Sequence, residues 1–510
     1  INENGELSVH PQKEKKGLSI SIPKVIAEMK KQNVHLPAVI RFQDILRDQV
    51  KNINETFLKV IKEADYQATY RGVFPIKVNQ IREVVEEIVE AGEPYSYGLE
   101  AGSKTELLAV LAYNKNKNSL TILNGYKDEE CLRLSMLGQL IGRNIIVVIE
   151  KLSELPLLIR IAKEMKVTPK IGIRAKLATK CKGKWISSSG DAAKFGLHVS
   201  EILDAIEILK QEKLLKSLKL LHFHIGSQLN DICDIKDAIT EAARIFVDLQ
   251  NRGLKLEYFD AGGGLGVDYD GSQSTNESSI NYNLEVYASD LVYILKQICD
   301  QADVKHPIIV TESGRALVAS HSMIVANVFD KITNENKNFN VSFNEEEHFL
   351  VTNMRDLKND LNEKNYQDIS NDAKQFKNES LNAFKLGVLK LDERAKIETL
   401  YWLILYEIKE ILRAFSKEDI PEGLRNLDQK LSVKYLCNFS VFQSLPDCWA
   451  IGQLLPIVPL ERLIEKPNVN CTLADITCDS DGRIDRFIGD NNVNRTIMFH
   501  ELKKDKDYNI

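Results

Sequence analysis

The most constraining feature of the sequence is a pattern repeated eight times between residues 70 and 315: a short β-rich run, a turn, and then an amphipathic stretch. The eight runs are TYRGVFPIK, YSYGLEAG, LTILNG, IIVVIE, KIGIRAK, LLHFHIGS, YFDAGGG and IIVTESG. The stretches between them, such as IREVVEEIVEAG and VSEILDAIEILKQ, are helix-like. Eight strand–helix units over about 250 residues are typical of a (β/α)8 TIM barrel. We therefore predict an α/β fold of this class, with a doubly wound sheet as the structural alternative.

The remainder of the chain has a different character on each side of this pattern. Stretches such as YQDISNDAKQFKNESLNAF and DERAKIETLYWLILYEIKEILRAF look helical, whereas GLSISIP, KYLCNFSVFQSLPD and VNCTLADITCDSDGRIDRFI look β-rich. We predict five segments. These are the N-terminal part of a β-rich domain at 1–45, the barrel at 46–320, more of the β-rich domain at 321–340, a helical insert at 341–430, and the C-terminal part of the β-rich domain at 431–510.

Composition excludes several classes of protein. With 67 basic and 73 acidic residues among 510, the net charge is −6, so neither nucleic acid nor a membrane surface is an expected partner. No apolar run approaches the ~20 residues of a membrane-spanning helix. The eight cysteines never adopt Cys-x-x-Cys spacing, which argues against a structural zinc site. We expect a cytoplasmic protein. Because the chain begins at Ile1, we also expect a processed or truncated piece.

Polar residues stand at the ends of the predicted strands. In a TIM barrel the C-terminal ends of the strands carry the active site, so these residues are predicted to converge on one rim. They are Lys77, Glu100, Asn124, Glu150, Arg174, His224, Gly262 to Gly264, and Glu312.

Two of these strand ends suggest chemistry of their own. Lys77 in VFPIKVN is flanked by apolar residues, so we expect it to be partly buried and therefore suited to forming a Schiff base. A lysine that merely extends to solvent from a strand end is the alternative, and on this residue alone it is favoured. The glycines of FDAGGGLG favour a cradle for an anion such as phosphate, although a tight turn would need them too.

Two further motifs carry candidate residues. In HFHIGS, His222 and His224 share one strand face and suit either ring stacking or metal binding, and for His222 we favour a core histidine. No other Asp- or His-rich strand end is evident that would complete a metal shell, so no metal site is assigned. In TESGR, Glu312 suits a pyridine nitrogen and Arg315 suits a phosphate. A surface ion pair between these two residues is the alternative.

Taken together, eight motifs in order make the chain resemble the fold-type III, pyridoxal-phosphate-dependent decarboxylases of basic amino acids. They are YRGVFPIKVNQ, YGLEAGSKTEL, KFGL, HFHIGSQL, FDAGGGLGVDYDG, TESGRALVASHS, NFSVFQSLPD and ITCDSDGRID. The resemblance extends over residues 1–510. The helical insert before NFSVFQSLPD points to the biosynthetic arginine decarboxylase branch of this family.

The resemblance implies a role for each matching residue. Lys77 would hold the cofactor, His224 would stack on its ring and Glu312 would pair with the ring nitrogen. The phosphate would contact Ser227, Gly262, Gly263, Gly264 and Arg315, with Glu100 and Arg174 beside the cofactor. Cys478 would protonate the product, and Asp479, Asp481, Asn438, Phe259 and Asp260 are assigned to the substrate. At Asn438, ornithine decarboxylases place an Asp, so its role is the least certain of these.

The resemblance also implies a reaction and an assembly. The reaction would be decarboxylation of L-arginine to agmatine and carbon dioxide, the first step of polyamine biosynthesis. The cofactors would be pyridoxal 5′-phosphate and Mg²⁺, and the assembly a homodimer or higher oligomer with an active site shared across the interface. The family's C-terminal Gly-Ala-Tyr run is missing, which agrees with a truncated piece. Three alternatives stay open: a decarboxylase of ornithine, lysine or diaminopimelate, a non-catalytic regulatory relative, and a metal-dependent hydrolase barrel.

Overall fold

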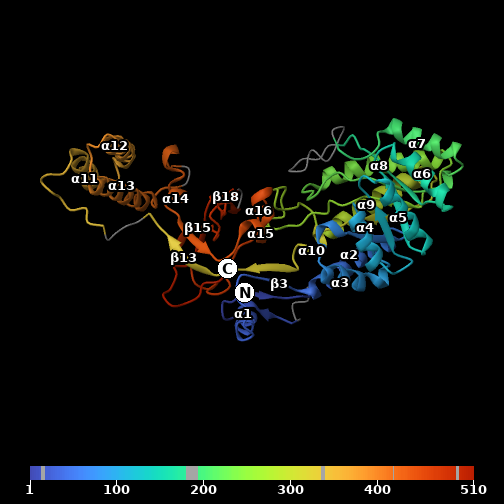
Figure 1. Cartoon of the computed structure of the whole chain (residues 1–510), viewed down its shortest axis with the longest axis horizontal. Helices are drawn as coiled ribbons and strands as arrows, with labels where there is room; N and C mark the ends of the chain where they lie inside the picture. The colour runs from blue at the N-terminus through green and yellow to red at the C-terminus, as the bar shows by residue number, and fades with distance from the viewer. Residues whose placement is uncertain (13–17, 180–192, 335–338, 417–418, 490–492) are drawn as a thin grey trace. The chain divides into compact units, whose positions relative to one another are not determined.

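The chain forms two compact units, which are described separately (Figure 1). The computed structural model describes residues 1–12, 18–179, 193–334, 339–416, 419–489 and 493–510. Unit 1 comprises residues 1–9, 20–38 and 324–510, and unit 2 comprises residues 10–19 and 39–323. Both ends of the chain therefore contribute to unit 1. The five-part division proposed from the sequence is finer than this grouping and stays a prediction.

Unit 2 is built around a closed barrel of eight parallel strands that follow one another in chain order. The strands are β4 (Tyr70–Pro75), β5 (Gly98–Ala101), β6 (Leu120–Leu123), β7 (Asn144–Ile149), β8 (Ile171–Arg174), β9 (Leu218–His222), β10 (Tyr258–Asp260) and β11 (Ile308–Thr311). Pairing of β11 with β4 closes the barrel. The predicted (β/α)8 barrel is thus confirmed, and the doubly wound alternative is wrong.

Helices follow the strands and surround the barrel (Figure 1). They are α2 (Gln43–Glu63), α3 (Arg82–Gly92), α4 (Lys104–Tyr113), α5 (Glu129–Leu140), α6 (Glu154–Met165), α7 (Val199–Gln211), α8 (Ile232–Asn251), α9 (Leu284–Gln301) and the short α10 (Arg315–Val318). Side chains that accept from free backbone N–H groups begin several of them. Ser103 caps α4, Asp128 caps α5 and Asn283 caps α9.

The barrel strands alternate between two apolar environments. A small cluster fills the barrel interior, and it consists of Val73, Leu120, Ile122, Ile146, Val148, Leu220 and Val310. The residues between these positions face the helices and join a much larger core. Because strand side chains alternate with period two, every second residue beyond an interior position also points toward the barrel axis. This rule places the polar residues at both ends of the barrel.

Unit 1 contains a five-stranded sheet and a group of helices. The sheet has the order β13 (Val328–Ile332), β14 (Val433–Cys437), β15 (Val469–Ala474), β16 (Arg483–Ile484), with β19 (Ile497–Phe499) also pairing with β15. Smaller pairs are β1 (Ser8–Val9) with β2 (Ile20–Ser21) and β17 (Phe487–Ile488) with β18 (Val493–Asn494). Where the chain passes between the units, β3 (Ala38–Arg41) pairs with β12 (Ser322–Val325).

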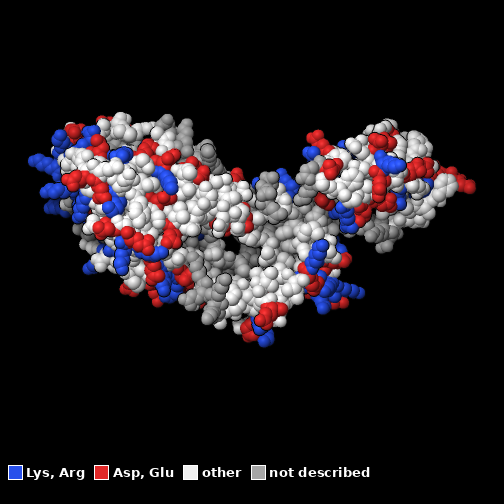
Figure 2. Space-filling view, turned by 180° about the vertical axis from the view of Figure 1, so that it is seen from behind, with Lys and Arg blue, Asp and Glu red and all other residues white. Residues whose placement is uncertain are grey.

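Three long helices of unit 1 share a hydrophobic core of their own. They are α11 (Phe349–Asp360), α12 (Tyr366–Lys385) and α13 (Leu391–Leu412), and they lie side by side in Figure 1. The shorter helices of unit 1 are α1 (Ile22–Lys31), α14 (Leu427–Lys430), α15 (Val441–Ser444) and α16 (Pro446–Ala450). Across the described ranges, the helices are all too short or too polar to cross a membrane. Acidic and basic side chains are interspersed on the face shown in Figure 2.

Candidate active site

A cluster of buried polar residues lies at the C-terminal end of the barrel. Arg174, His222 and Asp260 occupy one level on neighbouring strands, because Arg174 pairs in register with His222 and His222 with Asp260. Glu312 follows the interior residue Val310 by two positions, and Asn124 follows Ile122 in the same way. The predicted convergence of strand-end residues on one rim is therefore present.

Asn124 connects two carboxylates in this cluster. Its Nδ2 donates to Glu312 Oε1 at 2.9 Å and to Glu100 Oε1 at 3.2 Å. His222 Nδ1 lies 3.1 Å from Asp260 Oδ2 and 3.9 Å from Glu312 Oε1. Glu100 Oε2 has no hydrogen-bond partner among the described residues, and the contact between His222 Nδ1 and Asp260 Oδ2 is not a well-formed hydrogen bond. Such atoms are costly to bury, so the cluster is suited to receiving a further polar group.

Burial governs the ionisation of these groups. It raises the pKa of Glu100 to about 8, with a further contribution from the neighbouring Glu312. Burial and the nearby Asp260 raise the pKa of Glu312 to about 7, and burial raises that of Asp260 to about 7. Burial also lowers the pKa of His222. The site thus holds three carboxyl groups that are reluctant to ionise together, and a cation placed beside them would favour their charged forms.

His224 is half-buried at the end of β9 and is held by a backbone donor. The Gly263 N–H donates to His224 Nδ1 at 3.2 Å. Burial, followed by the charge of Arg174, holds the pKa of His224 well below its usual range. The ring is therefore neutral, and its Nδ1 is occupied as an acceptor.

The glycine run after β10 forms a tight backbone cradle. Gly262 has φ +65°, and a Cβ there would lie 2.3 Å from the Phe223 carbonyl oxygen. A Cβ at Gly263 would lie 2.9 Å from the Glu312 carbonyl oxygen. Beside this run, Arg315 Nη2 donates to Ser227 Oγ at 3.1 Å. The structure thus brings Ser227 and Arg315 together beside a glycine turn in which neighbouring backbone atoms exclude any side chain.

Lys77 does not have the burial expected from its sequence context. It lies in the short 3₁₀ turn η1 (Ile76–Val78) directly after β4, and its side chain is exposed although Ile76 is buried. The expectation of a partly buried lysine is wrong, because the 3₁₀ turn carries Lys77 past the end of the packed strand. Its position at the rim is as predicted, four residues beyond the interior Val73.

A buried ion-pair network supports Arg174 from the neighbouring strands. Arg174 Nη1 lies 3.1 Å from Glu150 Oε2, and the Gly125 N–H donates to Glu150 Oε1 at 2.9 Å. Lys127 Nζ lies 3.4 Å from Glu154 Oε2, which also accepts from the Glu150 N–H at 3.0 Å. The sequence did not suggest Lys127 and Glu154 as site residues. Charged residues that follow two adjacent strand ends would have been the only available signal.

The remaining predicted catalytic residues belong to unit 1. Cys478, Asp479 and Asp481 are exposed on the turn between β15 and β16. A buried residue that the sequence did not suggest, Asp475, holds this turn. Its Oδ1 accepts from the Thr477 N–H at 2.9 Å, and its Oδ2 accepts from the Val441 N–H at 2.8 Å. The alternative that Cys478 is a small buried filler is wrong.

Two residues assigned to the substrate have structural surroundings instead. Asn438 Oδ1 accepts from the Asn327 N–H at 2.8 Å, and its Nδ2 donates to the Leu36 carbonyl oxygen at 3.0 Å, so both ends of its amide bind backbone. Phe259 is fully buried and packs against Phe246 of α8, on the helix-facing side of β10. Neither position supports contact with a substrate.

The structure also revises the analysis of metal binding. His222, Asp260 and Glu312 each offer one ligand atom, and these atoms lie within 4.8 Å of one another. The expectation that no further acidic strand end would join a histidine is therefore wrong, since strands β10 and β11 bring Asp260 and Glu312 to His222. The Mg²⁺ implied by the resemblance stays a prediction.

Comparisons with known proteins agree with this architecture. Residues 50–319 match the family model described as "Pyridoxal-dependent decarboxylase, pyridoxal binding domain", and residues 344–428 match the "Arginine decarboxylase helical bundle domain". The chain is 44% identical to the biosynthetic arginine decarboxylase of Phocaeicola vulgatus, over all of this chain and 80% of that protein. It is 43% identical to the corresponding protein of Gloeobacter violaceus, over all of this chain and 78% of that protein.

Solved structures show the same similarity. The biosynthetic arginine decarboxylase SpeA from Campylobacter jejuni matches all of this chain and 81% of its own, with a TM-score of 0.84 and 34% identity. A diaminopimelate decarboxylase from M. jannaschii has a TM-score of 0.62 at 16% identity, matching 95% of this chain and 82% of its own. At that identity the second similarity concerns the fold alone.

Proposed function

The chain belongs to the biosynthetic arginine decarboxylases, and on that premise we propose that it converts L-arginine to agmatine and carbon dioxide with pyridoxal 5′-phosphate (PLP), as the first step of polyamine biosynthesis. One observation carries the proposal at the level of residues. A single barrel rim holds Lys77, His224 and Glu312 together with the glycine cradle and the Ser227–Arg315 pair.

The residues at this rim fit PLP. The cradle at Gly262 to Gly264 has no room for side chains, and Ser227 and Arg315 lie beside it as donors for a phosphate. The buried polar atoms of Glu100, His222 and Asp260 supply polar partners for a heteroaromatic ring. When bound, the cofactor supplies an electron sink, because its protonated pyridine ring accepts the electron pair left by the departing carboxylate.

Each rim residue then has a distinct task. Lys77 Nζ would hold the cofactor covalently, and its exposed position would leave the side chain free to move. Glu312 would pair with the ring nitrogen and keep it protonated. A carboxyl whose pKa is raised to about 7 by burial becomes fully charged when a cation is brought beside it. His224, kept neutral, would cover the ring face and exclude water.

The turn between β15 and β16 in unit 1 would complete the site. Cys478 would return a proton to the α-carbon as general acid, and Asp479 and Asp481 would bind the guanidinium group, whose planar donors suit carboxylates. We propose that this turn is supplied by a second copy of the chain in a homodimer or higher oligomer. The exposure of all three residues supports this arrangement.

Cofactor binding tests the proposal directly. Adding PLP to the cofactor-free protein should produce the near-visible absorption band of a lysine-bound cofactor, together with release of carbon dioxide from L-arginine. Lys77→Ala should lose both the band and the activity. Lys151→Ala removes an exposed lysine just past strand β7 of the same barrel and should keep both. A band that persists in Lys77→Ala, or is lost in Lys151→Ala, would contradict the assignment.

A further inference from the structure

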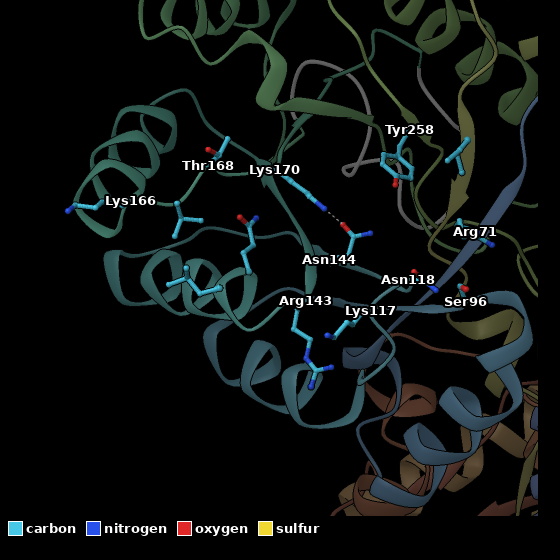
Figure 3. Close-up of a pocket in the computed structure, with 15 residues that line it drawn as sticks. Arg71, Ser96, Lys117, Asn118, Arg143, Asn144, Lys166, Thr168, Lys170 and Tyr258 are labelled. Atoms are coloured by element: carbon cyan, nitrogen blue, oxygen red, sulfur yellow. Dashed lines mark hydrogen bonds between the residues drawn. The ribbon is translucent and has the colours of Figure 1, made fainter.

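A second hollow lies at the opposite, N-terminal end of the barrel (Figure 3). It has a volume of ≈ 740 Å³, within the range of small-molecule sites. Residues from most of the barrel strands and the loops that precede them line it. Those used below are Arg71, Lys117, Arg143, Lys166, Lys170 and Tyr258. Nothing in the proposed decarboxylation uses this end of the molecule.

The alternation of side chains along the strands, which places polar residues at the active rim, also places polar residues at this hollow. Arg71 precedes the interior residue Val73 by two positions, Asn144 precedes Ile146, and Lys170 precedes the close-packed Gly172. These side chains therefore point toward the barrel axis below the apolar layer. Tyr258, half-buried, lies at the start of β10 and packs against that layer. The hollow is thus lined by residues at the start of barrel strands together with residues of the loops that precede them.

The charge of this hollow is entirely of one sign. Five of its lining residues are basic and none is acidic. Within the described part of the chain, none of the five forms an ion pair with a carboxylate, whereas Arg133 on nearby α5 pairs with both Glu129 and Glu164. The acidic residue next to the hollow, Glu257, is already paired with Lys219 at 2.5 Å. Like charges gathered without counter-charges repel each other, so an anion would stabilise this end of the barrel.

Backbone carbonyl oxygens bind only some of the donors on the basic side chains that line the hollow. Arg71 Nη1 donates to the Tyr95 carbonyl oxygen at 3.0 Å, and Arg143 Nη1 donates to that of Lys115 at 2.6 Å. These bonds fix the two guanidinium groups, as is common at helix C-termini. The Arg143 Nε–H, however, is buried with no partner among the described residues.

The lysines retain donors for a ligand. Lys170 Nζ donates to Asn144 Oδ1 at 2.7 Å, which uses one of its three hydrogens. Lys117 lies over Gly142, where its Nζ would be 3.9 Å from a Cβ at that position, and it points toward Arg143 in Figure 3. Lys166 points away from the hollow in the same view. The anion site therefore centres on Lys117 and Lys170.

We propose that this hollow binds a small molecule that carries linked phosphate groups. Guanidinium groups that are already oriented, together with mobile ammonium groups, match the many oxygens of a polyphosphate. Several unpaired cations exceed the charge of one monoanion, and the volume exceeds that of one phosphate. The net charge of −6 favours a small ligand over a nucleic acid.

Calorimetric titration of the PLP-saturated protein with inorganic tripolyphosphate tests this proposal, because the cofactor then fills the phosphate site at the other end. We expect binding at one site per chain, weaker binding of orthophosphate, and affinity that falls as salt rises from 0.05 to 0.3 M, concentrations chosen because screening strengthens across that range. Lys117→Ala combined with Lys170→Ala should weaken the binding of tripolyphosphate by about tenfold or more. Titration with ATP distinguishes a free polyphosphate from a nucleotide as the ligand. An affinity for ATP equal to that for tripolyphosphate indicates recognition of the phosphates alone, and a higher affinity for ATP indicates a nucleotide.

A matched variant controls for net charge. Lys364→Ala combined with Lys374→Ala removes the same charge from exposed positions of the helical group in unit 1 and should leave tripolyphosphate binding unchanged. Retention of the PLP absorption band and of the melting temperature shows that the barrel variant is folded, and Lys170→Gln alone serves as a milder change. Absence of binding to the wild-type protein, or equal affinity in the wild type and the folded double variant, would overturn the proposal.

Discussion

At the residue scale, the surroundings of Glu312 have opposing effects on its pKa. Burial and Asp260 oppose its charge, whereas the hydrogen bond from Asn124 at 2.9 Å supports it. We expect Glu312→Gln to lower kcat by about 100-fold or more, the scale of losing one oriented charge at a reacting centre, because a neutral amide does not hold the ring nitrogen in its protonated form. Steady-state carbon dioxide release measures this. Unchanged kcat, with the PLP band retained, would contradict the role of Glu312.

Ionisation of Asp260 makes the free energy of unfolding depend on pH. Burial raises its pKa from 3.8 to about 7, so the folded protein binds a proton more tightly there than the unfolded chain does. Stability of the cofactor-free protein should therefore be lost as pH rises from about 4 to 7 and level off above that. Asp260→Asn removes this loss while its Oδ1 still accepts from the Gly262 N–H.

Melting temperatures of the two proteins, measured between pH 5 and 8, test this directly. The difference in favour of Asp260→Asn should grow toward pH 7, reaching the order of a few kcal/mol in unfolding free energy. A difference that is constant across this range would show that Asp260 ionises normally in the folded protein.

At the scale of elements, the glycine turn after β10 is the part of the site with least room. A methyl group at Gly263 would lie 2.9 Å from the Glu312 carbonyl oxygen and 3.4 Å from His224 Cε1. We expect Gly263→Ala to weaken PLP binding at least tenfold, because the cradle would be crowded where a phosphate approaches it. Gly423→Ala, at an exposed position of unit 1 with nothing within 4 Å and no left-handed backbone, should leave PLP affinity unchanged. Equal effects of the two substitutions would point to general destabilisation.

At the same scale, sequence analysis predicted the barrel but did not predict several local features of the site. Eight apolar runs of the right length predict a closed barrel, and period two then places Glu100, Arg174 and Glu312 on one rim. The exposure of Lys77 was missed because a 3₁₀ turn cannot be distinguished from a strand continuation in VFPIKVN. The bracing of Asn438 by Asn327 and Leu36 joins segments far apart in the chain. The residues that line the basic hollow are spread through the sequence from Arg71 to Tyr258, so no local sequence pattern predicts it.

At the scale of the whole molecule, the proposed site draws Lys77 and Cys478 from different copies of the chain. If so, Lys77→Ala and Cys478→Ala proteins should each be inactive alone but active after mixing and subunit exchange. Random exchange in a dimer restores one intact site in half of the dimers, which is about a quarter of wild-type activity. Mixtures that stay inactive despite verified exchange would place both residues of each site on one chain.

The measurement that bears most directly on the central claim is release of carbon dioxide by the PLP-loaded protein from L-arginine, L-ornithine, L-lysine and diaminopimelate, measured in parallel. Carboxylates at Asp479 and Asp481 match a planar guanidinium group best, so kcat/KM should be highest for arginine, with agmatine as the product. A higher kcat/KM for any of the other three, or no carbon dioxide from arginine, would contradict the account.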